Sequence, residues 1–427
     1  MSAIADHPLR YNLANEMHAR PFPLIEAPAT AAFLAIKRSQ NAAARERAHD
    51  RAHLCALLDR FGAAHPPPDA THYFGQIGKH WLKWESHTEF VTYTAFSNRL
   101  GTRAFDPADF EVFPDDWLSQ APGERVTSAL LRIEEMTQEA TMERQMNDWF
   151  VPESLALSYV LDEAALIAGD FSIDQAGHMR FAVFAAKDTG PQRIGRIVQR
   201  LCEVETYKAM SMLGFARAAE TRGVMAKFDA TLSELMDDMT LHETPAEATL
   251  QDLLAVSSEL EKLAADTSFR FGATEAYEVI VNARITVLRE ERFKGRQTFG
   301  EFMMRRYDPA MRTVAASRRR LVAMADRAMR AGELLRTRVE VERSAQNQQL
   351  LEGMNRRAEV QLHMQQTVEG LSVVAISYYA VNLVAYALYP VVKSFGGVDK
   401  ALLMALVTLP VVGLVWLAVR RIRRRFS

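Results

Sequence analysis

The run GLSVVAISYYAVNLVAYALYPVV, from Gly370 to Val392, contains 23 residues and no formal charge. A second uncharged run, ALLMALVTLPVVGLVWLAV, extends over the 19 residues from Ala401 to Val419. An α-helix rises about 1.5 Å per residue, so each run is long enough to cross a hydrocarbon core of about 30 Å. The sequence therefore predicts two transmembrane helices, 370–392 and 401–419, that form a hairpin around a short outer loop, 393–400.

The tail 420–427 predicts how these spans are oriented. It contains Arg420, Arg421, Arg423, Arg424 and Arg425, and basic residues beside a span stay on the cytoplasmic side. Two spans return the chain to the side where it started, so both termini are expected in the cytoplasm. The prediction is a two-span protein of an inner membrane, with the lipid bilayer as a partner and a large cytoplasmic body.

Residues 1–187 of this body are expected to form an α+β domain with a mainly antiparallel sheet. Aromatic and β-branched residues at a spacing of two predict strands. Those strands are 81–85, 89–96 and 126–133, together with a hairpin of 164–173 and 178–186. Helices are predicted over 6–21 and 42–61, which end at proline or glycine.

Residues 188–308 are expected to form a helical domain without strands, and residues 309–369 are expected to form a long stalk helix. Apolar residues at helical spacing give helices over 193–215, 220–239, 246–263 and 273–291. No proline occurs between Pro309 and Pro390. The stalk is therefore one helix, or two nearly collinear helices interrupted near Gly332 or Gly353, that continues into the first span.

A seam of residues spaced alternately four and three apart runs along this stalk, which is typical of a coiled coil. Its members are Leu350, Met354, Arg357, Gln361, Met364, Val368, Leu371, Ala375, Tyr378, Asn382, Ala385 and Tyr389. The seam predicts a homo-oligomer. Alternatively, it is one of the several seams that any long helix offers, and its Arg and Gln oppose the coiled coil.

Several long motifs resemble a bacterial family of predicted membrane-anchored proteins, catalogued as domain of unknown function 3422. They are 7–21 (HPLRYNLANEMHARP), 84–90 (WESHTEF), 205–210 (ETYKAM), 288–292 (LREER), 334–339 (LLRTRV) and 365–379 (QQTVEGLSVVAISYY). The resemblance extends from end to end and implies a membrane location, but no activity.

The layout is also similar to that of CorA-type divalent-cation channels, which have an α/β domain, a stalk helix, two spans and a basic end. Their Gly-Met-Asn signature after the first span is replaced here by the stretch 389–397, YPVVKSFGG. The outer loop contains one acid, Asp399, against Lys393 and Lys400. These differences favour an anchored structural or regulatory protein over a cation channel, which remains the alternative.

Two groups of residues in the body are candidate sites. Glu85, His87 and Glu89 alternate along one predicted strand face and are a possible site for a divalent metal such as Mn²⁺, Fe²⁺ or Zn²⁺. If residues 86–88 form a bend, the three belong to a solvated rim instead, and no metal-dependent enzyme follows.

Asn15, Glu16, His18 and Arg20 share the first predicted helix and are candidates for binding a ligand or a partner. The alternative is an ordinary pair of Glu16 with Arg20, four residues apart, beside a packed His18.

Asn382 is the strongly polar residue of the first span, and Tyr378 lies one turn before it. Hydrocarbon does not satisfy an amide, so Asn382 is expected to contact another helix or to line a pore. The two cysteines, Cys55 and Cys202, are far apart and unlike a metal-binding pair. No catalytic triad, phosphate-binding loop or basic aromatic platform for nucleic acid is recognisable.

Overall fold

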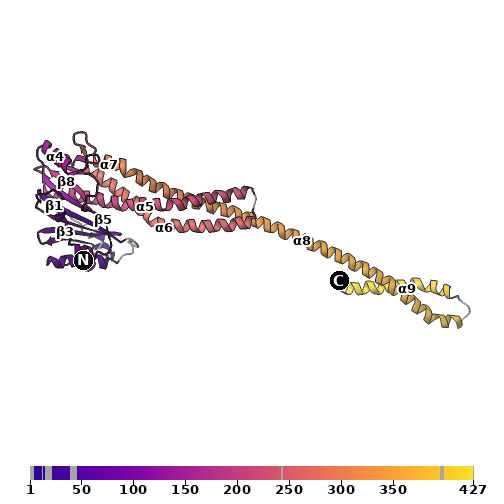
Figure 1. Cartoon of the computed structure of the whole chain (residues 1–427). Helices are drawn as coiled ribbons and strands as arrows, with labels where there is room; N and C mark the ends of the chain where they lie inside the picture. The colour runs from indigo at the N-terminus through magenta and orange to yellow at the C-terminus, as the bar shows by residue number, and fades with distance from the viewer. Residues whose placement is uncertain are drawn as a thin grey trace. The chain divides into compact units, whose positions relative to one another are not determined.

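The computed structural model describes residues 4–11, 13–14, 22–38, 46–241, 244–394 and 399–426. Contacts divide the chain into two compact units (Figure 1). The first unit comprises Met1–Leu241 and Gln251–Ala331, and the second comprises His242–Leu250 and Gly332–Ser427.

The first unit is built on one mixed sheet, in the order β2-β3-β4-β1-β5-β8-β7-β6-β9 across the described residues. The strands are β1 (Ala29–Lys37), β2 (His72–Ile77), β3 (His80–Ser86), β4 (Phe90–Ser97), β5 (Glu124–Glu135), β6 (Ala156–Val160), β7 (Ala165–Gly169), β8 (Met179–Ala185) and β9 (Glu291–Arg292). Within this sheet β5 and β8 pair in parallel, and the other neighbours pair antiparallel. The predicted mainly antiparallel sheet is therefore confirmed.

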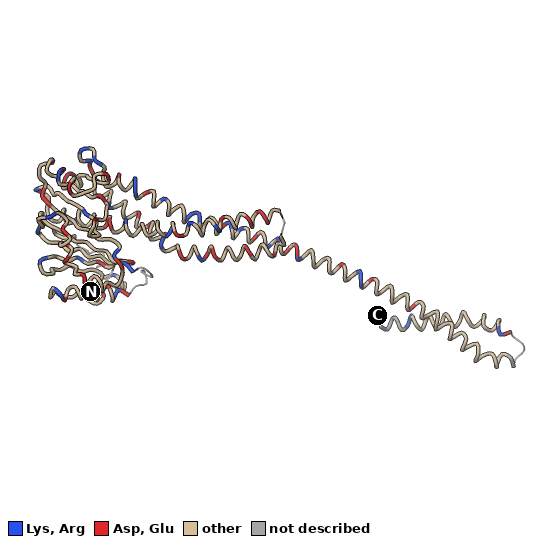
Figure 2. The backbone as a smooth tube through the Cα atoms, in the orientation of Figure 1, with Lys and Arg blue, Asp and Glu red and all other residues tan. Residues whose placement is uncertain are grey.

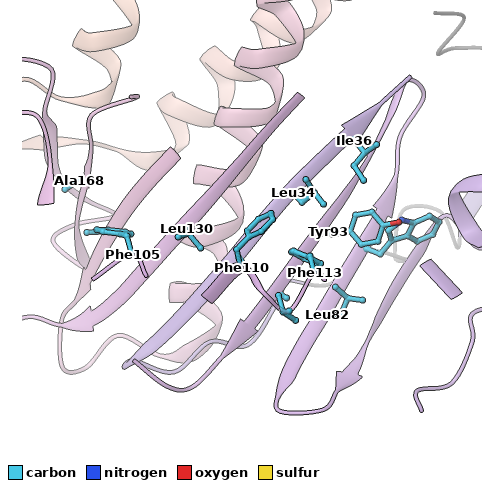
Figure 3. Packing of buried hydrophobic residues seen from close by; sticks show 14 of the residues in the cluster. Leu34, Ile36, Leu82, Tyr93, Phe105, Phe110, Phe113, Leu130 and Ala168 are labelled. Carbon is cyan, nitrogen blue, oxygen red and sulfur yellow. The ribbon is translucent and has the colours of Figure 1, made fainter. Parts of the chain in front are cut away.

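Side chains alternate between the two faces of the sheet, and each face has its own core. Leu34, Leu82 and Tyr93 point to one face, where they lie near Phe110 and Phe113 (Figure 3). The helices of this face are α2 (Arg47–Arg60), the 3-10 helix η2 (Pro107–Phe110), α3 (Asp115–Leu118) and α4 (Glu139–Trp149).

Phe33 and Phe96 point to the opposite face, which α5 (Pro191–Leu241) and α7 (Phe299–Arg306) cover. Ile197, Val198 and Leu201 of α5 are fully buried there. This is the face that carries the cavity described below.

Three long helices continue from this layer: α5, α6 (Ala246–Leu288) and α8 (Asp308–Ser394). Within the first unit they share small apolar cores, one of which contains Val204 of α5, Val281 of α6 and Met311 of α8. Figure 2 shows acidic and basic residues distributed along these helices. The second unit holds the rest of α8 and α9 (Lys400–Phe426).

The predicted breaks in the helical region were wrong. The helices predicted over 193–215 and 220–239 form the single helix α5. Those predicted over 246–263 and 273–291 form α6, which ends at Leu288. Gly214 lies inside α5 because a Cβ at that position would collide with Thr274 of α6. This glycine therefore permits a close approach of two helices rather than ending one. The prediction of no strand after residue 188 was also wrong, since β9 lies there.

Other expectations agree with the structure. The hairpin around 174–177 forms from β7 and β8, and β3 and β4 pair across the bend at 87–89. Of the two possibilities for the stalk, one continuous helix is present, since α8 passes through Gly332 and Gly353. In the described part of 6–21, helical turns occur at Arg10, Tyr11, Leu13 and Ala14.

Candidate functional site

Two described helices are long and apolar enough to cross a membrane. Their most apolar windows have a mean hydropathy of 1.7 and 2.5, and only 11% and 6% of these windows is buried by protein. Apolar side chains such as Leu383 of α8 and Leu409 of α9 are 68% and 81% exposed. A core helix of a soluble protein would have these side chains covered, so apolar surroundings fit both helices better than water.

Asn382, the polar candidate of the first apolar run, donates a hydrogen bond from its Nδ2 to the carbonyl oxygen of Tyr378, at 2.9 Å. The bond joins successive turns of the same helix and uses one of the two donors of the amide. A contact with another helix and a pore lining both remain predictions.

The first unit contains a cavity of about 230 Å³ between the sheet and helices α5 and α6. Two of the motifs singled out in the sequence meet there. Glu85, His87 and Phe90 come from the motif at 84–90, and Thr206 and Tyr207 come from the motif at 205–210. The two motifs are more than a hundred residues apart in the sequence, so only the fold could show that they line one space.

The floor of this cavity is an ion pair between neighbours on one face of β3. Lys83 Nζ lies 3.2 Å from Glu85 Oε2, and the two side chains are only 6% and 13% exposed. They share this face because residues two apart on a strand point the same way. Thr94 and Thr92 of β4 lie directly opposite Lys83 and Glu85 in the strand register and also line the cavity.

A chain of polar contacts leads from this floor to the rim of the cavity. Lys83 Nζ donates to Gln199 Oε1 at 2.8 Å, and Gln199 Nε2 donates to Glu203 Oε1 at 2.8 Å. Arg284 of α6 donates from its Nε to Glu203 Oε2 and is 41% exposed. The charges thus alternate along the cavity in the order Glu85, Lys83, Glu203, Arg284.

Glu89 is not part of this chain, although it lies in the same hairpin. It is 1% exposed, and its carboxylate accepts hydrogen bonds from Arg270 and, at 2.7 Å, from the hydroxyl of Tyr277. Burial and the adjacent carboxylate raise the pKa of Tyr277 well above its ordinary value. Arg270, Tyr277 and Arg284 are seven residues apart along α6, which places them along one face of that helix.

The three predicted metal ligands therefore each contact a different partner. Glu85 pairs with Lys83, the ring of His87 stacks on Phe90 with centroids 4.4 Å apart, and Glu89 pairs with Arg270. The strand ends at Ser86, so the register on which the metal hypothesis depended does not continue to Glu89. Across the described ranges, no group of three His, Cys, Asp or Glu side chains is placed to hold a metal ion. The metal site stays a prediction without support from this geometry.

The four residues proposed on the first helix, Asn15, Glu16, His18 and Arg20, lie outside the described residues. Both cysteines are buried. Burial raises the pKa of the Cys202 thiol, which lines the cavity, far above its ordinary value. A thiol held in its protonated form is a poor nucleophile.

A body with a mixed, mainly antiparallel sheet, in one chain with two apolar C-terminal helices, defines a candidate membrane-anchored protein. The chain belongs to the family described as "Protein of unknown function (DUF3422)", whose model matches residues 5–426. No curated protein and no solved structure matches the chain. The family resemblance of the sequence motifs is confirmed, whereas the likeness to CorA-type channels is not confirmed by these comparisons.

Proposed function

We propose that this protein is anchored in a bacterial inner membrane by two spans, 370–392 and 401–419, and serves there as a structural or regulatory oligomer. The observation that carries the proposal is the exposed apolar surface of α8 and α9. Val374 and Leu406, one from each helix, are 68% and 70% exposed. Fully burying one such side chain is worth about 1.5–3 kcal/mol, so many of them strongly favour an apolar environment.

The arginine-rich tail supports an orientation with both termini in the cytoplasm. The large α+β body would then lie on the cytoplasmic side, with only 393–400 outside.

Self-association is supported by the part of α8 that precedes the first span. Leu350, Met354, Met364 and Val368 of the predicted seam are each 60–67% exposed. A single helix that exposes such a row of side chains to water gains free energy when a second copy covers them.

Reporter fusions at Ser2 and Ser427 test the anchoring and its orientation together. We expect cytoplasmic signals from both fusions and fractionation of the protein with membranes. A periplasmic signal at either end would contradict the two-span topology, and a protein that remains soluble without detergent would contradict the anchor.

A further inference from the structure

We propose that the cavity between β3, β4, α5 and α6 binds a small zwitterion, a molecule with one ammonium and one carboxylate group, such as an α-amino acid. The proposal concerns the first unit alone and does not depend on the membrane anchor. It rests on the balance, the order and the accessibility of the charges that line this space.

The charged groups of the cavity are balanced in pairs. Two acids, Glu85 and Glu203, line it together with two bases, Lys83 and Arg284. An unpaired charge is strongly unfavourable in a partly buried site. A ligand with a net charge would leave one charge uncompensated, so the balance favours a ligand that is neutral overall.

Acidic and basic groups alternate along the cavity, and this arrangement favours a ligand that carries one positive and one negative charge over an uncharged ligand such as a sugar. Glu203 and Arg284 form an accessible pair at the rim, with side chains 22% and 41% exposed. A ligand carboxylate beside Arg284 and a ligand ammonium beside Glu203 would keep every charge compensated. Hydrogen bonds between charged partners are roughly twice as strong as those between neutral groups, so a sugar would make weaker contacts.

The floor offers a further contact to a carboxylate. An ammonium group has three donors; Lys83 donates one of them to Gln199 and lies 3.2 Å from Glu85 in an ion pair. The hydroxyl of Thr94, opposite Lys83 in the register, adds a polar contact on the same face.

The size and the apolar wall restrict the ligand further. Phe33, Phe90 and Val198 form an apolar part of the lining that suits a hydrocarbon substituent. The volume of about 230 Å³ is below the range of about 300–1,000 Å³ that is usual for sites of drug-sized ligands. Only a small zwitterion would fit without rearrangement.

Calorimetric titration of the full chain in detergent tests this proposal. The probes are the twenty common amino acids and glycine betaine, with acetate, methylammonium and glucose as controls. We expect at least one zwitterion to bind at least about tenfold more tightly than each control, which corresponds to about 1.4 kcal/mol. Absence of binding by every zwitterion, or equal affinity for acetate or methylammonium, would overturn the proposal.

Arg284→Met is the decisive variant because Arg284 is the most exposed of the four charged groups named above. Its removal leaves the cavity with an excess negative charge. We therefore expect about tenfold weaker binding of the zwitterion and tighter binding of methylammonium. Arg318→Met, which removes an exposed arginine from α8, is the matched control and should leave both affinities unchanged.

Thr94→Val provides a second test that leaves the ion pairs intact. We expect this variant to fold like the wild type and to bind the zwitterion several-fold more weakly. Unchanged binding in both Arg284→Met and Thr94→Val would place the ligand outside this cavity and refute the assignment.

Discussion

The first unit contains two kinds of ion pair, one accessible to solvent and one buried. Glu203 and Arg284 are accessible at the rim of a cavity, whereas Glu89 is buried with its partners Arg270 and Tyr277. A buried ion pair adds little net stability, but removal of one partner leaves an uncompensated charge. The pair of Glu89 and Arg270 thus connects the β3–β4 hairpin to α6 and is sensitive to single substitutions.

We expect Arg270→Met to lower the free energy of unfolding by about 3–5 kcal/mol, because it leaves the Glu89 carboxylate buried without its cation. The double variant Glu89→Leu with Arg270→Met should recover part of this loss. Denaturant unfolding followed by tryptophan fluorescence measures both effects.

The matched control for this prediction is Arg318→Met. Arg318 and its partner Glu275 are 50% and 63% exposed, and such surface pairs contribute only about 0–1 kcal/mol. An equally small effect for Arg270→Met would show that the buried pair does not support the fold.

Three partly or fully buried histidines predict a loss of stability in mild acid. Burial lowers the pKa of His53 and His178, and it lowers the pKa of His80 from 6.5 to about 4. Between these values the unfolded chain binds protons that the folded chain does not bind. Stability should therefore be fully present above about pH 6.5 and fall as the pH drops toward 4.

His80→Gln tests the largest of these contributions. A shift of one pKa unit corresponds to about 1.4 kcal/mol, so His80 accounts for at most about 3 kcal/mol of the acid loss. Melting temperatures of the variant should depend less on pH between 6.5 and 4. An unchanged pH dependence in His80→Gln would contradict the assignment.

At the scale of the elements, strands could be predicted from the sequence where polar residues alternate with apolar ones. Both strands were predicted from a period of two, since Lys83 and Glu85 interrupt the apolar residues of β3, and Thr92 and Thr94 interrupt those of β4. β1 was not predicted, because its residues are buried on both faces and show no alternation. The break predicted after residue 215 was wrong because α5 packs against α6 there, where Gly214 leaves room for Thr274.

Some residues of the cavity could be predicted from the sequence, and others could not. Glu85 and His87 were found from the sequence because carboxylates and imidazoles two residues apart on a strand are a pattern of metal ligands. Gln199, Glu203 and Arg284 were missed because they are ordinary residues of exposed helix faces in the sequence. Only the packing of α5 and α6 against the sheet brings them to the cavity.

Asn382→Leu tests the role of α8 in assembly. Polar contacts between helices in a membrane are worth about 0.6 kcal/mol on average and up to roughly 2 kcal/mol. If the amide contacts a neighbouring protomer, the substitution should weaken the oligomer modestly while the protein still inserts. Crosslinking in detergent or liposomes measures this change.

The other outcomes for position 382 are also distinct. If Asn382→Leu leaves assembly intact but abolishes an ion flux in liposomes, the amide lines a pore rather than forming a contact between protomers. A cysteine substituted for Asn382 that neither labels with a water-soluble thiol reagent nor crosslinks to a second copy would contradict both the seam and the pore.

At the scale of the whole molecule, the apolar runs and the whole predicted seam, which starts at Leu350, lie after residue 345. Residues 1–345, expressed alone, should therefore be soluble and folded, and they should self-associate less than the full chain. Sedimentation velocity compares the two. Equal oligomer size would place the assembly interface within residues 1–345 instead.

The strand order of the sheet has a consequence for synthesis of the chain. β6 ends at Val160, but β9, which covers its edge through Ser158 and Tyr159, begins only at Glu291. At about 5–20 residues per second, the ribosome needs roughly ten seconds to make the intervening segment. During that interval β6 is an open edge that could pair with another nascent chain. Translational pauses between Val160 and Glu291 should therefore increase aggregation more than pauses placed after Arg292.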